Sequence, residues 1–421
     1  MKRILVLVLL LSISACQLNN TVKNNNFSDN GALPTQETIS VKPTISQTAT
    51  KILTSGENIK VESTPIVTQS PSITPTNPAL SETPTIQTSD LSSSIINPLT
   101  GLPVYNSDLL NLPPALVSIA NFPVSARPQA GLSFSPFVFE MYIGEGMTRF
   151  LALFYGEYPS EKASQDNLTP LDNSQIGPIR SGRLPYESIR KLYSGFLVMA
   201  SAYRAVSNQL SAATNIYGSD EDDINSALID VSKLEAIAEA NTSNNQSMNL
   251  TGNQYSSITP NGGSSARRFW VFYNFLNQVD WQYDETSGKY LRSQDISDGS
   301  GTFTPSSDRL TGEQLSVENV ILFVAKHKVL NSEGTLIDLD LLYTGNKAFL
   351  FRDGIMYPIL WNTMNGEYEK STGLLRPIRF TDLNDKPISL KPGHTWVEIV
   401  DVTTTLEEMD PGTWKARFYA P

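Results

Sequence analysis

Four arginines and two glutamates lie within one stretch of the sequence, between about residues 126 and 183. They are Arg127, Glu140, Glu145, Arg149, Arg180 and Arg183. Glycine, proline or serine occurs near each arginine, and the segments between them are apolar enough to form strands. The planar guanidinium group matches carboxylate and phosphate with two hydrogen bonds. Arginines on turns between rigid strands therefore predict a site for an anionic ligand.

The two glutamates allow other interpretations. Glu140 and Glu145 are separated by a strand end and a glycine-rich turn, and paired carboxyl groups can act as general acid and base in hydrolysis. Their spacing neither enforces nor forbids a shared cleft. In a structural role, one of them instead pairs with Arg127 or Arg149, while the arginines brace loops by donating to backbone carbonyl groups. Glu140 interrupts an apolar strand, where a carboxylate is costly without a partner.

Other chemistries find little support in the sequence. The two histidines, His327 and His394, are widely separated, and Cys16 is the single cysteine. The sequence has no phosphate-binding loop, no glycine-rich dinucleotide motif and no nucleophile elbow. It therefore predicts no metal site and no cofactor. The formal net charge of −11 argues against nucleic acid as a partner.

The N-terminus has the features of an export signal. Lys2 and Arg3 precede an apolar core of eight residues, which is too short to span a bilayer as a helix. The run Ile13-Ser14-Ala15-Cys16 is similar to a lipobox. We therefore predict a signal over residues 1–16, lipid on Cys16, contact with the membrane through that lipid, and an extracytoplasmic, lipid-anchored location. The alternative is an ordinary secretory signal with an incidental cysteine.

The composition changes along the rest of the chain and predicts three parts. Residues 17–96 are rich in Thr, Ser and Pro and predict a disordered tether. Residues 97–265 predict an α/β layered N-terminal domain, with strands at 114–120, 137–143, 148–155 and 195–200 and helices at 185–193, 203–213 and 232–240. Residues 266–421 predict a mostly β C-terminal domain. Because strand ends gather their loops at one rim of a sheet, we expect the four arginines to lie near one another, with Glu140 or Glu145 among them.

Several motifs occur in the order found in a known family. In the first half they are Asn97-Pro98-Leu99-Thr100-Gly101, the segments 126–132 and 145–152, and Ile176-Gly177-Pro178-Ile179-Arg180-Ser181. In the second half they are Trp281-Gln282-Tyr283-Asp284, the segment 308–312, Asn319-Val320-Ile321 and Pro392-Gly393-His394-Thr395-Trp396. With these motifs the chain resembles the YerB-like bacterial lipoproteins, a family of unknown function with an N-terminal and a C-terminal domain.

The resemblance implies an α/β first domain and a lipid-anchored location, and it supplies no reaction. The chain departs from the family pattern in two places. Met199-Ala200-Ser201-Ala202-Tyr203 replaces a segment of the His-Ala-Gly-Gly type, and the Asn- and Ser-rich residues 241–265 replace a loop with a Pro-His-Asn sequence. If those histidines serve a shared activity, this chain lacks them.

Three hypotheses for the function follow from the sequence. The first is a non-enzymatic envelope lipoprotein that binds an anionic wall polymer or an envelope protein. The second is a hydrolase or lyase that acts on a cell-wall polymer with Glu140 or Glu145 as acid or base. The third is a solute-binding lipoprotein. That class normally has two similar α/β lobes, and the β-rich second half argues against it.

Overall fold

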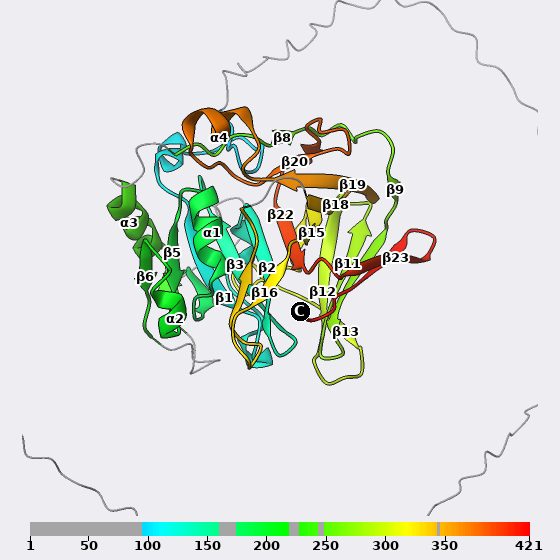
Figure 1. Cartoon of the computed structure of the whole chain (residues 1–421), viewed down its shortest axis with the longest axis horizontal. Coiled ribbons are helices and arrows are strands. Elements are labelled where there is room, and N and C mark those ends of the chain that lie inside the picture. Colours follow the sequence, from blue (N-terminus) through cyan, green and yellow to red (C-terminus); the bar gives the residue numbers. More distant parts are fainter. Residues whose placement is uncertain (1–94, 160–173, 219–226, 243–247, 343–345) are drawn as a thin grey trace, which may run out of the picture. The chain divides into compact units, whose positions relative to one another are not determined.

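The computed structural model describes residues 95–159, 174–218, 227–242, 248–342 and 346–421 (Figure 1). The predicted signal, Cys16 and nearly all of the predicted tether lie outside these residues. The described residues all belong to one compact unit. Within the described ranges, no helix is long and apolar enough to cross a membrane.

A sheet of 13 strands forms the centre of this unit. Its main path runs β20-β19-β18-β15-β22-β2-β3-β1-β4-β7, and β5, β6 and β9 join at its sides. In chain order the strands are β1 (Ala115–Ala120), β2 (Phe137–Gly144), β3 (Met147–Phe154), β4 (Gln175–Ile179), β5 (Phe196–Met199), β6 (Ala213–Asn215), β7 (Ala227–Asp230), β9 (Ser264–Ser265), β15 (Asn319–Val324), β18 (Asn346–Arg352), β19 (Ile355–Asn362), β20 (Arg379–Thr381) and β22 (Thr395–Val400). All residues of β1, β2, β15 and β22 are buried, which explains their nearly continuous apolar sequences.

The central sheet is built from both halves of the chain. Strand β22, from the C-terminal half, lies between β2 and β15 and is parallel to both. In this register Glu140 of β2 is the direct neighbour of Glu398 of β22. The sheet therefore continues without a break across the boundary expected at residues 265 and 266.

A second sheet of seven strands packs against one face of the central sheet (Figure 1). Its strands are β10 (Arg268–Asn274), β11 (Asn277–Asp284), β12 (Lys289–Asp295), β13 (Phe303–Pro305), β14 (Ser316–Val317), β23 (Thr405–Asp410) and β24 (Thr413–Arg417). Val271 and Trp281 of this sheet share a core with Phe150 and Trp396 of the central sheet. Two short ladders, β8 (Gln254–Tyr255) with β21 (Ser389–Leu390) and β16 (His327–Val329) with β17 (Ile337–Leu339), complete the strand pairing.

Helix α1 (Pro185–Leu192) covers the opposite face of the central sheet, where Tyr186, Ile189 and Leu192 pack in a core with Phe137 and Phe139. The other helices are α2 (Arg204–Ser207), α3 (Val231–Asn241) and α4 (Glu367–Thr372), and the 3-10 turns are η1 (Ser107–Asn111), η2 (Val124–Ala126) and η3 (Leu132–Phe134).

The described residues are mostly β, as predicted for the second half of the chain. The α/β layering predicted for residues 97–265 is not confirmed, because most strand pairs in this part are antiparallel and few helices cover them. Helices α1 and α3 agree with the prediction. The helix predicted over 203–213 is a single turn, α2, and the chain then leads into β6. Ser207, Asn208 and Ser211 favour caps and turns over helix interiors, which explains the early end.

Candidate functional site

The candidate residues do not form a single site, because Glu140 and Arg149 lie on opposite faces of the central sheet. Glu140 on β2 lies opposite Phe150 on β3, whereas Arg149 lies opposite Met141. Neighbouring residues of a strand point to opposite faces, so the side chains of Glu140 and Arg149 are on different sides of the sheet. Glu140 faces the second sheet, and Arg149 faces the side that α1 covers.

Arg149, Arg180 and Arg183 come together on the α1 side, and we call them the arginine cluster. Nη1 of Arg149 donates to the carbonyl oxygen of Ser181 at 3.2 Å. Nη1 of Arg183 donates to the same oxygen at 3.4 Å and to the carbonyl oxygen of Gly182 at 3.0 Å. Arg180 lies close enough to lower the pKa of both other arginines.

The arginine cluster lies where the central sheet forks. One edge of β1 pairs with β5 through Ala115–Val117 and with β4 through Ile119. Residues 180–183 pass between the diverging strands: the Arg180 amide donates to the Ser118 carbonyl at 2.9 Å, and the Ala200 amide donates to the Arg180 carbonyl at 3.1 Å. The fork therefore places residues 180–183, with two of the three arginines, between β4 and β5.

The residues beside the fork are closely packed. The Gly182 amide donates to the Ser201 carbonyl at 2.7 Å, and a Cβ atom on Gly182 would lie 2.4 Å from Sδ of Met199. The ends of the Met199 and Leu210 side chains therefore lie directly against Gly182. Ser201 belongs to the segment in which the chain departs from the pattern of the YerB-like lipoproteins, so that departure lies directly beside the arginine cluster.

Burial and neighbouring cations act on Arg149 and Arg183 of the cluster. Burial lowers the pKa of Arg149 to about 9; Tyr186 acts to raise it, and Arg183 and Arg180 lower it further. Burial also lowers the pKa of Arg183. Within the described ranges, no carboxylate is among the charged groups that act on these two side chains, and Nε of each has no hydrogen-bond partner. Such a group of cations favours a bound anion.

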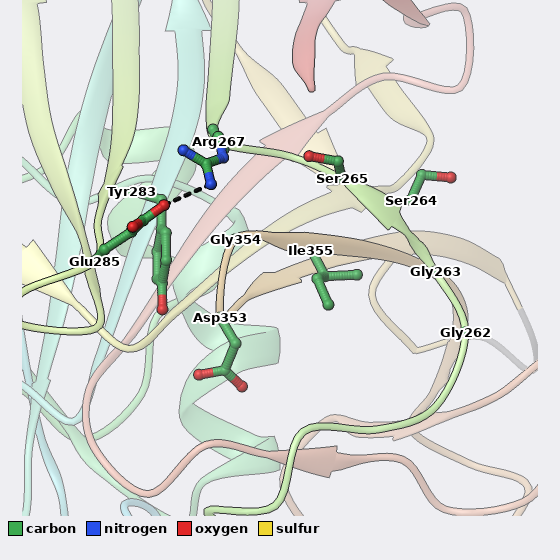
Figure 2. Close-up of a pocket in the computed structure, with 10 residues that line it drawn as sticks. All are labelled: Gly262, Gly263, Ser264, Ser265, Arg267, Tyr283, Glu285, Asp353, Gly354 and Ile355. Atoms are coloured by element: carbon green, nitrogen blue, oxygen red, sulfur yellow. Dashed lines mark ion pairs between the residues drawn. The ribbon is translucent and has the colours of Figure 1, made fainter. Parts of the chain in front are cut away.

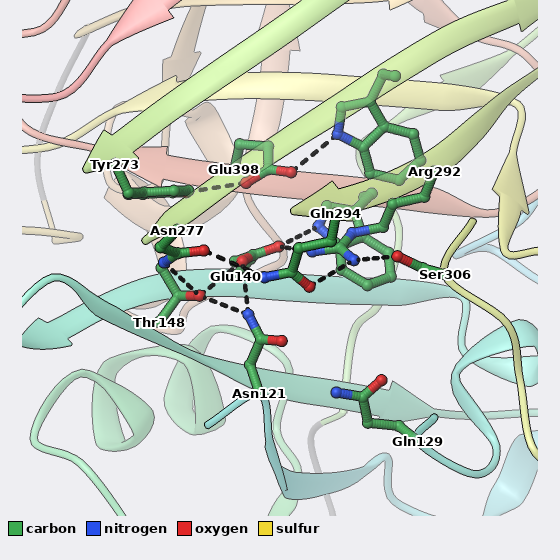
Figure 3. A network of polar contacts seen from close by, with 12 residues as sticks. Asn121, Gln129, Glu140, Thr148, Tyr273, Asn277, Arg292, Gln294, Ser306 and Glu398 are labelled. Atoms are coloured by element: carbon green, nitrogen blue, oxygen red, sulfur yellow. Dashed lines mark hydrogen bonds and ion pairs between the residues drawn. The ribbon is translucent and has the colours of Figure 1, made fainter. Parts of the chain in front are cut away.

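Glu140 belongs to a buried polar network between the two sheets (Figure 3). Its Oε2 accepts from Nη2 of Arg292 at 2.9 Å and from Nε1 of Trp396 at 3.2 Å. Its Oε1 accepts from Oγ1 of Thr148 at 2.7 Å and from Nδ2 of Asn121 at 3.3 Å. The carboxylate is 0% exposed and has several partners, so this geometry is that of a structural ion pair.

Arg292 is the cation of this network. Its Nη1 donates to Ser306 and Gln294, and its guanidinium carbon lies 4.8 Å from the ring centre of Trp396. Arg292 is 1% exposed, and Glu140 supplies the negative charge that makes its burial tolerable.

Glu398 is a second buried carboxyl group of the network. It accepts hydrogen bonds from the Tyr273 hydroxyl at 2.8 Å and from Nε1 of Trp281 at 2.9 Å. Burial, followed by repulsion from Glu140, raises the pKa of Glu398 to about 8. The Glu398 carboxyl group is therefore mainly protonated at neutral pH.

Arg127 and Glu145 lie outside the arginine cluster. Arg127 donates through Nε to the Asn121 carbonyl at 3.2 Å and through Nη1 to the Asp295 carbonyl at 2.9 Å. It thereby links the two halves of the chain, as a loop-bracing arginine does. Glu145 is exposed in the turn between β2 and β3, with a φ of 53°.

Sequence reasoning missed Arg292 and Glu398. The sequence contains a signal for Glu398, since it interrupts the apolar strand β22 just as Glu140 interrupts β2. Arg292 has no comparable local signal, because its partner Glu140 is 152 positions away. Among the described residues, no group of three or more His, Cys, Asp or Glu side chains is arranged to hold a metal ion.

The fold and the site define a class of β-rich proteins in which two consecutive parts of the chain complete one sheet. Family models match both parts: "Protein of unknown function (DUF3048) N-terminal domain" matches residues 99–253, and the corresponding C-terminal domain matches residues 270–397. Together they cover more than half of the chain. The chain belongs to this family, and the resemblance seen in the sequence is confirmed.

A relative and a solved structure agree with this assignment. The chain is 27% identical over 326 residues to a protein of Bacillus subtilis (strain 168) named "Putative lipoprotein YerB". The aligned region covers 74% of this chain and 88% of that protein. It also matches the crystal structure of the YerB protein from Bacillus subtilis with a TM-score of 0.56 and 23% identity. That match covers 73% of this chain and 96% of the other, and it shows that the fold is shared.

Proposed function

We propose that this protein is a lipid-anchored, extracytoplasmic lipoprotein that binds an anionic envelope ligand at the arginine cluster. The main support comes from two guanidinium groups of the cluster: among the described residues no carboxylate acts on Arg149 or Arg183, and Nε of each has no hydrogen-bond partner. A phosphate or carboxylate group of a wall polymer supplies a negative charge for them. It also accepts the paired hydrogen bonds that guanidinium groups donate.

Two observations support the anchor: the run Ile13-Ser14-Ala15-Cys16 and the name of the Bacillus subtilis relative. We expect the Cys16→Ala variant to leave the membrane fraction or to accumulate as an uncleaved precursor, because the thiol that carries the lipid is gone. Fractionation with immunoblotting measures both. Normal processing together with unchanged membrane partition contradicts the lipobox interpretation.

Two variants that each lose one positive charge test the ligand site. We expect Arg183→Gln to weaken the binding of inorganic phosphate or citrate by about tenfold, as is typical for the loss of one charge-assisted contact. Lys191→Gln is the matched control, since it removes a positive charge from an exposed position of α1. Titration calorimetry on the full-length protein gives the affinities. Equal weakening in both variants indicates a general charge effect, and absence of binding to either anion contradicts the proposal.

The other hypotheses have less support in the geometry. A hydrolase or lyase that uses Glu140 and Glu145 needs both carboxyl groups at one cleft, but Glu140 is fully buried and Glu145 is exposed on a turn. A solute-binding lipoprotein opens between two lobes, whereas here β2 and β22 join the halves in one sheet. An envelope protein that presents an acidic segment fits the same arginine cluster. A pull-down that recovers a protein with the unchanged chain but not with Arg183→Gln favours a protein ligand over a wall polymer.

A further inference from the structure

The two ends of the second sheet differ in chemical character. At one end Arg267 precedes β10 and Glu285 follows β11, and Nη2 of Arg267 lies 2.6 Å from Oε1 of Glu285 (Figure 2). With the turn between β18 and β19, these two residues line a cleft of about 370 Å³. At the other end, the turn between β10 and β11 consists of Phe275 and Leu276, and both are exposed. Turns usually carry polar residues, so this apolar turn has no explanation in the fold alone.

The loop between β12 and β13 extends the apolar end. A Cβ atom on Gly299 of this loop would lie 3.7 Å from Cδ2 of Phe275 and 3.9 Å from Cδ2 of Leu276, so the loop contacts the turn. Ile296, in the same loop, is also exposed. In Figure 1 the loop that leads into β13 reaches the lower end of the view.

The hairpin of β16 and β17 lies at the same end of the molecule. The turn between β2 and β3 connects it with the second sheet: Nδ2 of Asn277 donates to the Gly146 carbonyl at 3.0 Å. On the other side of that turn, a Cβ atom on Gly144 would lie 2.9 Å from the Gly334 carbonyl oxygen, between β16 and β17. Five large apolar residues are exposed at this end, which we call the apolar end: Phe275, Leu276, Ile296, Val329 and Leu330.

Aromatic rings and cations occupy the outer face of the second sheet, next to the apolar end. The guanidinium carbon of Arg417 lies 5.2 Å from the ring centre of Phe272, and Nζ of Lys415 lies 3.8 Å from the ring centre of Trp270. The residues between them on β10 and β24 belong to the core, so these four side chains point outward. Rings and basic side chains beside apolar tips are typical of the boundary between water and lipid.

We propose that the apolar end inserts into a phospholipid bilayer without help from the lipid predicted on Cys16. The five apolar side chains enter the hydrocarbon boundary, while Arg417 and Lys415 contact headgroup phosphates. A bilayer fits better than a protein partner, because the side chains come from three separate connections between strands. A fluid surface accepts separate tips, whereas a protein interface needs one closely packed patch.

Insertion, and not attraction between net charges, holds this end in the bilayer. Glu145, Asp298 and Glu333 are exposed in the same group of turns and oppose binding to anionic lipid. Zwitterionic lipid is therefore sufficient. The proposal shares with the proposed function only a location at a membrane, since it uses neither the arginine cluster nor the anchor.

Vesicle co-sedimentation of residues 17–421 tests the proposal, because this chain contains every described residue and lacks the predicted signal and lipid. We expect it to bind phosphatidylcholine vesicles and to remain bound at about 0.5 M NaCl, where charge attraction is largely screened. Phe275→Ser combined with Leu276→Ser is expected to raise the lipid concentration for half-maximal binding about tenfold or more, because two large apolar side chains no longer leave water.

Ile258→Ser is the matched control. Ile258 is 79% exposed, and its carbonyl accepts from Nη2 of Arg352 beside the turn between β18 and β19, at the charged end. We expect this variant to bind vesicles as the unchanged chain does.

A fluorescent label reports insertion directly. Residues 17–421 contain no cysteine, so Ile296→Cys can be labelled at one position with an NBD group, whose emission depends on polarity. We expect this emission to increase and to shift to shorter wavelength when vesicles are added. The emission of NBD on Ile258→Cys is expected to stay unchanged.

Four results overturn the proposal. The first two are absence of co-sedimentation and equal binding by the unchanged chain and by Phe275→Ser with Leu276→Ser. The third is loss of binding at about 0.5 M NaCl, which assigns the contact to charge. The fourth is a dimer in size-exclusion chromatography that these two substitutions convert to a monomer, which assigns the apolar end to a second copy of the chain. Arg183→Gln is expected to leave vesicle binding unchanged, so failure here is distinguishable from failure of the anion site.

Discussion

Glu140 and Glu398 are direct neighbours in the central sheet, yet their electrostatic surroundings differ. Glu140 has Arg292 as its partner, whereas burial and the charge of Glu140 raise the pKa of Glu398. The sequence shows that Glu140 interrupts an apolar strand, where an unpaired carboxylate is costly. This position indicated that Glu140 has a partner, and the structure shows one. The identity of that partner depends on how distant strands meet, which single-residue properties do not contain.

The raised pKa of Glu398 predicts a pH dependence of stability. Its folded pKa of about 8 lies above the ordinary value of 4.5, so the folded state holds the proton more tightly. The stabilisation is complete below about pH 4.5 and is lost as the pH rises through about 8. Glu398→Gln removes this titration and keeps a carbonyl oxygen for Trp281. The melting temperature of both proteins is expected to fall when the pH is raised from 6 to 9. We expect the decrease in the variant to be smaller than in the unchanged protein by about 5 °C.

Differential scanning calorimetry at both pH values measures this difference. Glu145→Gln is the control, because Glu145 is exposed. We expect this substitution to leave the pH dependence of the melting temperature unchanged. An identical pH dependence in Glu398→Gln and the unchanged protein contradicts the assignment of the proton to Glu398.

At the scale of elements, two glycines lie in close contact with their surroundings at the fork beside β1. Gly195 joins α1 to β5, and its Cβ would lie 2.5 Å from the Pro114 carbonyl oxygen. At Gly182 the nearest atoms belong to the ends of the Met199 and Leu210 side chains. The sequence predicted α1 and β5 from their apolar spacing. It did not predict the fork, because the sequences of β4 and β5 do not show that both strands pair with the same edge of β1.

This contrast predicts unequal effects of alanine. We expect Gly195→Ala to lower the free energy of unfolding by more than about 2 kcal/mol, because the backbone of β1 must shift. Gly182→Ala is the matched control, with a smaller expected loss because flexible side chains can move aside. Urea unfolding followed by tryptophan fluorescence measures both. Equal losses contradict the interpretation that backbone approach sets the geometry of the fork.

At the scale of the whole molecule, the two halves are parts of one structure. Periodicity and family motifs located the change from the first half to the second, and the family models match the two parts as an N-terminal and a C-terminal domain. The structure adds that strands of both parts join in one sheet. The pairing of β2 with β22, the link from Arg127 to Asp295 and the ion pair of Glu140 with Arg292 all cross that boundary. Apolar strands such as β2 and β22 fit any central position in a sheet, so their sequences alone do not predict which strands pair with them.

We therefore expect residues 97–265, expressed alone, to remain unfolded or insoluble, because β2 has an open edge and Glu140 is buried without its cation. Co-expression with residues 266–421 is expected to restore a soluble complex. Circular dichroism and size-exclusion chromatography follow both outcomes, and residues 95–421 serve as the folded control. A stable, monomeric fragment of residues 97–265 contradicts this view.

The pairing of β2 with β22 also sets the order in which synthesis and folding occur. Glu140 and Trp396 touch across 256 positions of sequence, so the ribosome has nearly finished the chain before β2 can gain this neighbour. Sheets that depend on such distant contacts form slowly. A nascent chain of this kind therefore lacks its complete central sheet until β22 has been synthesised.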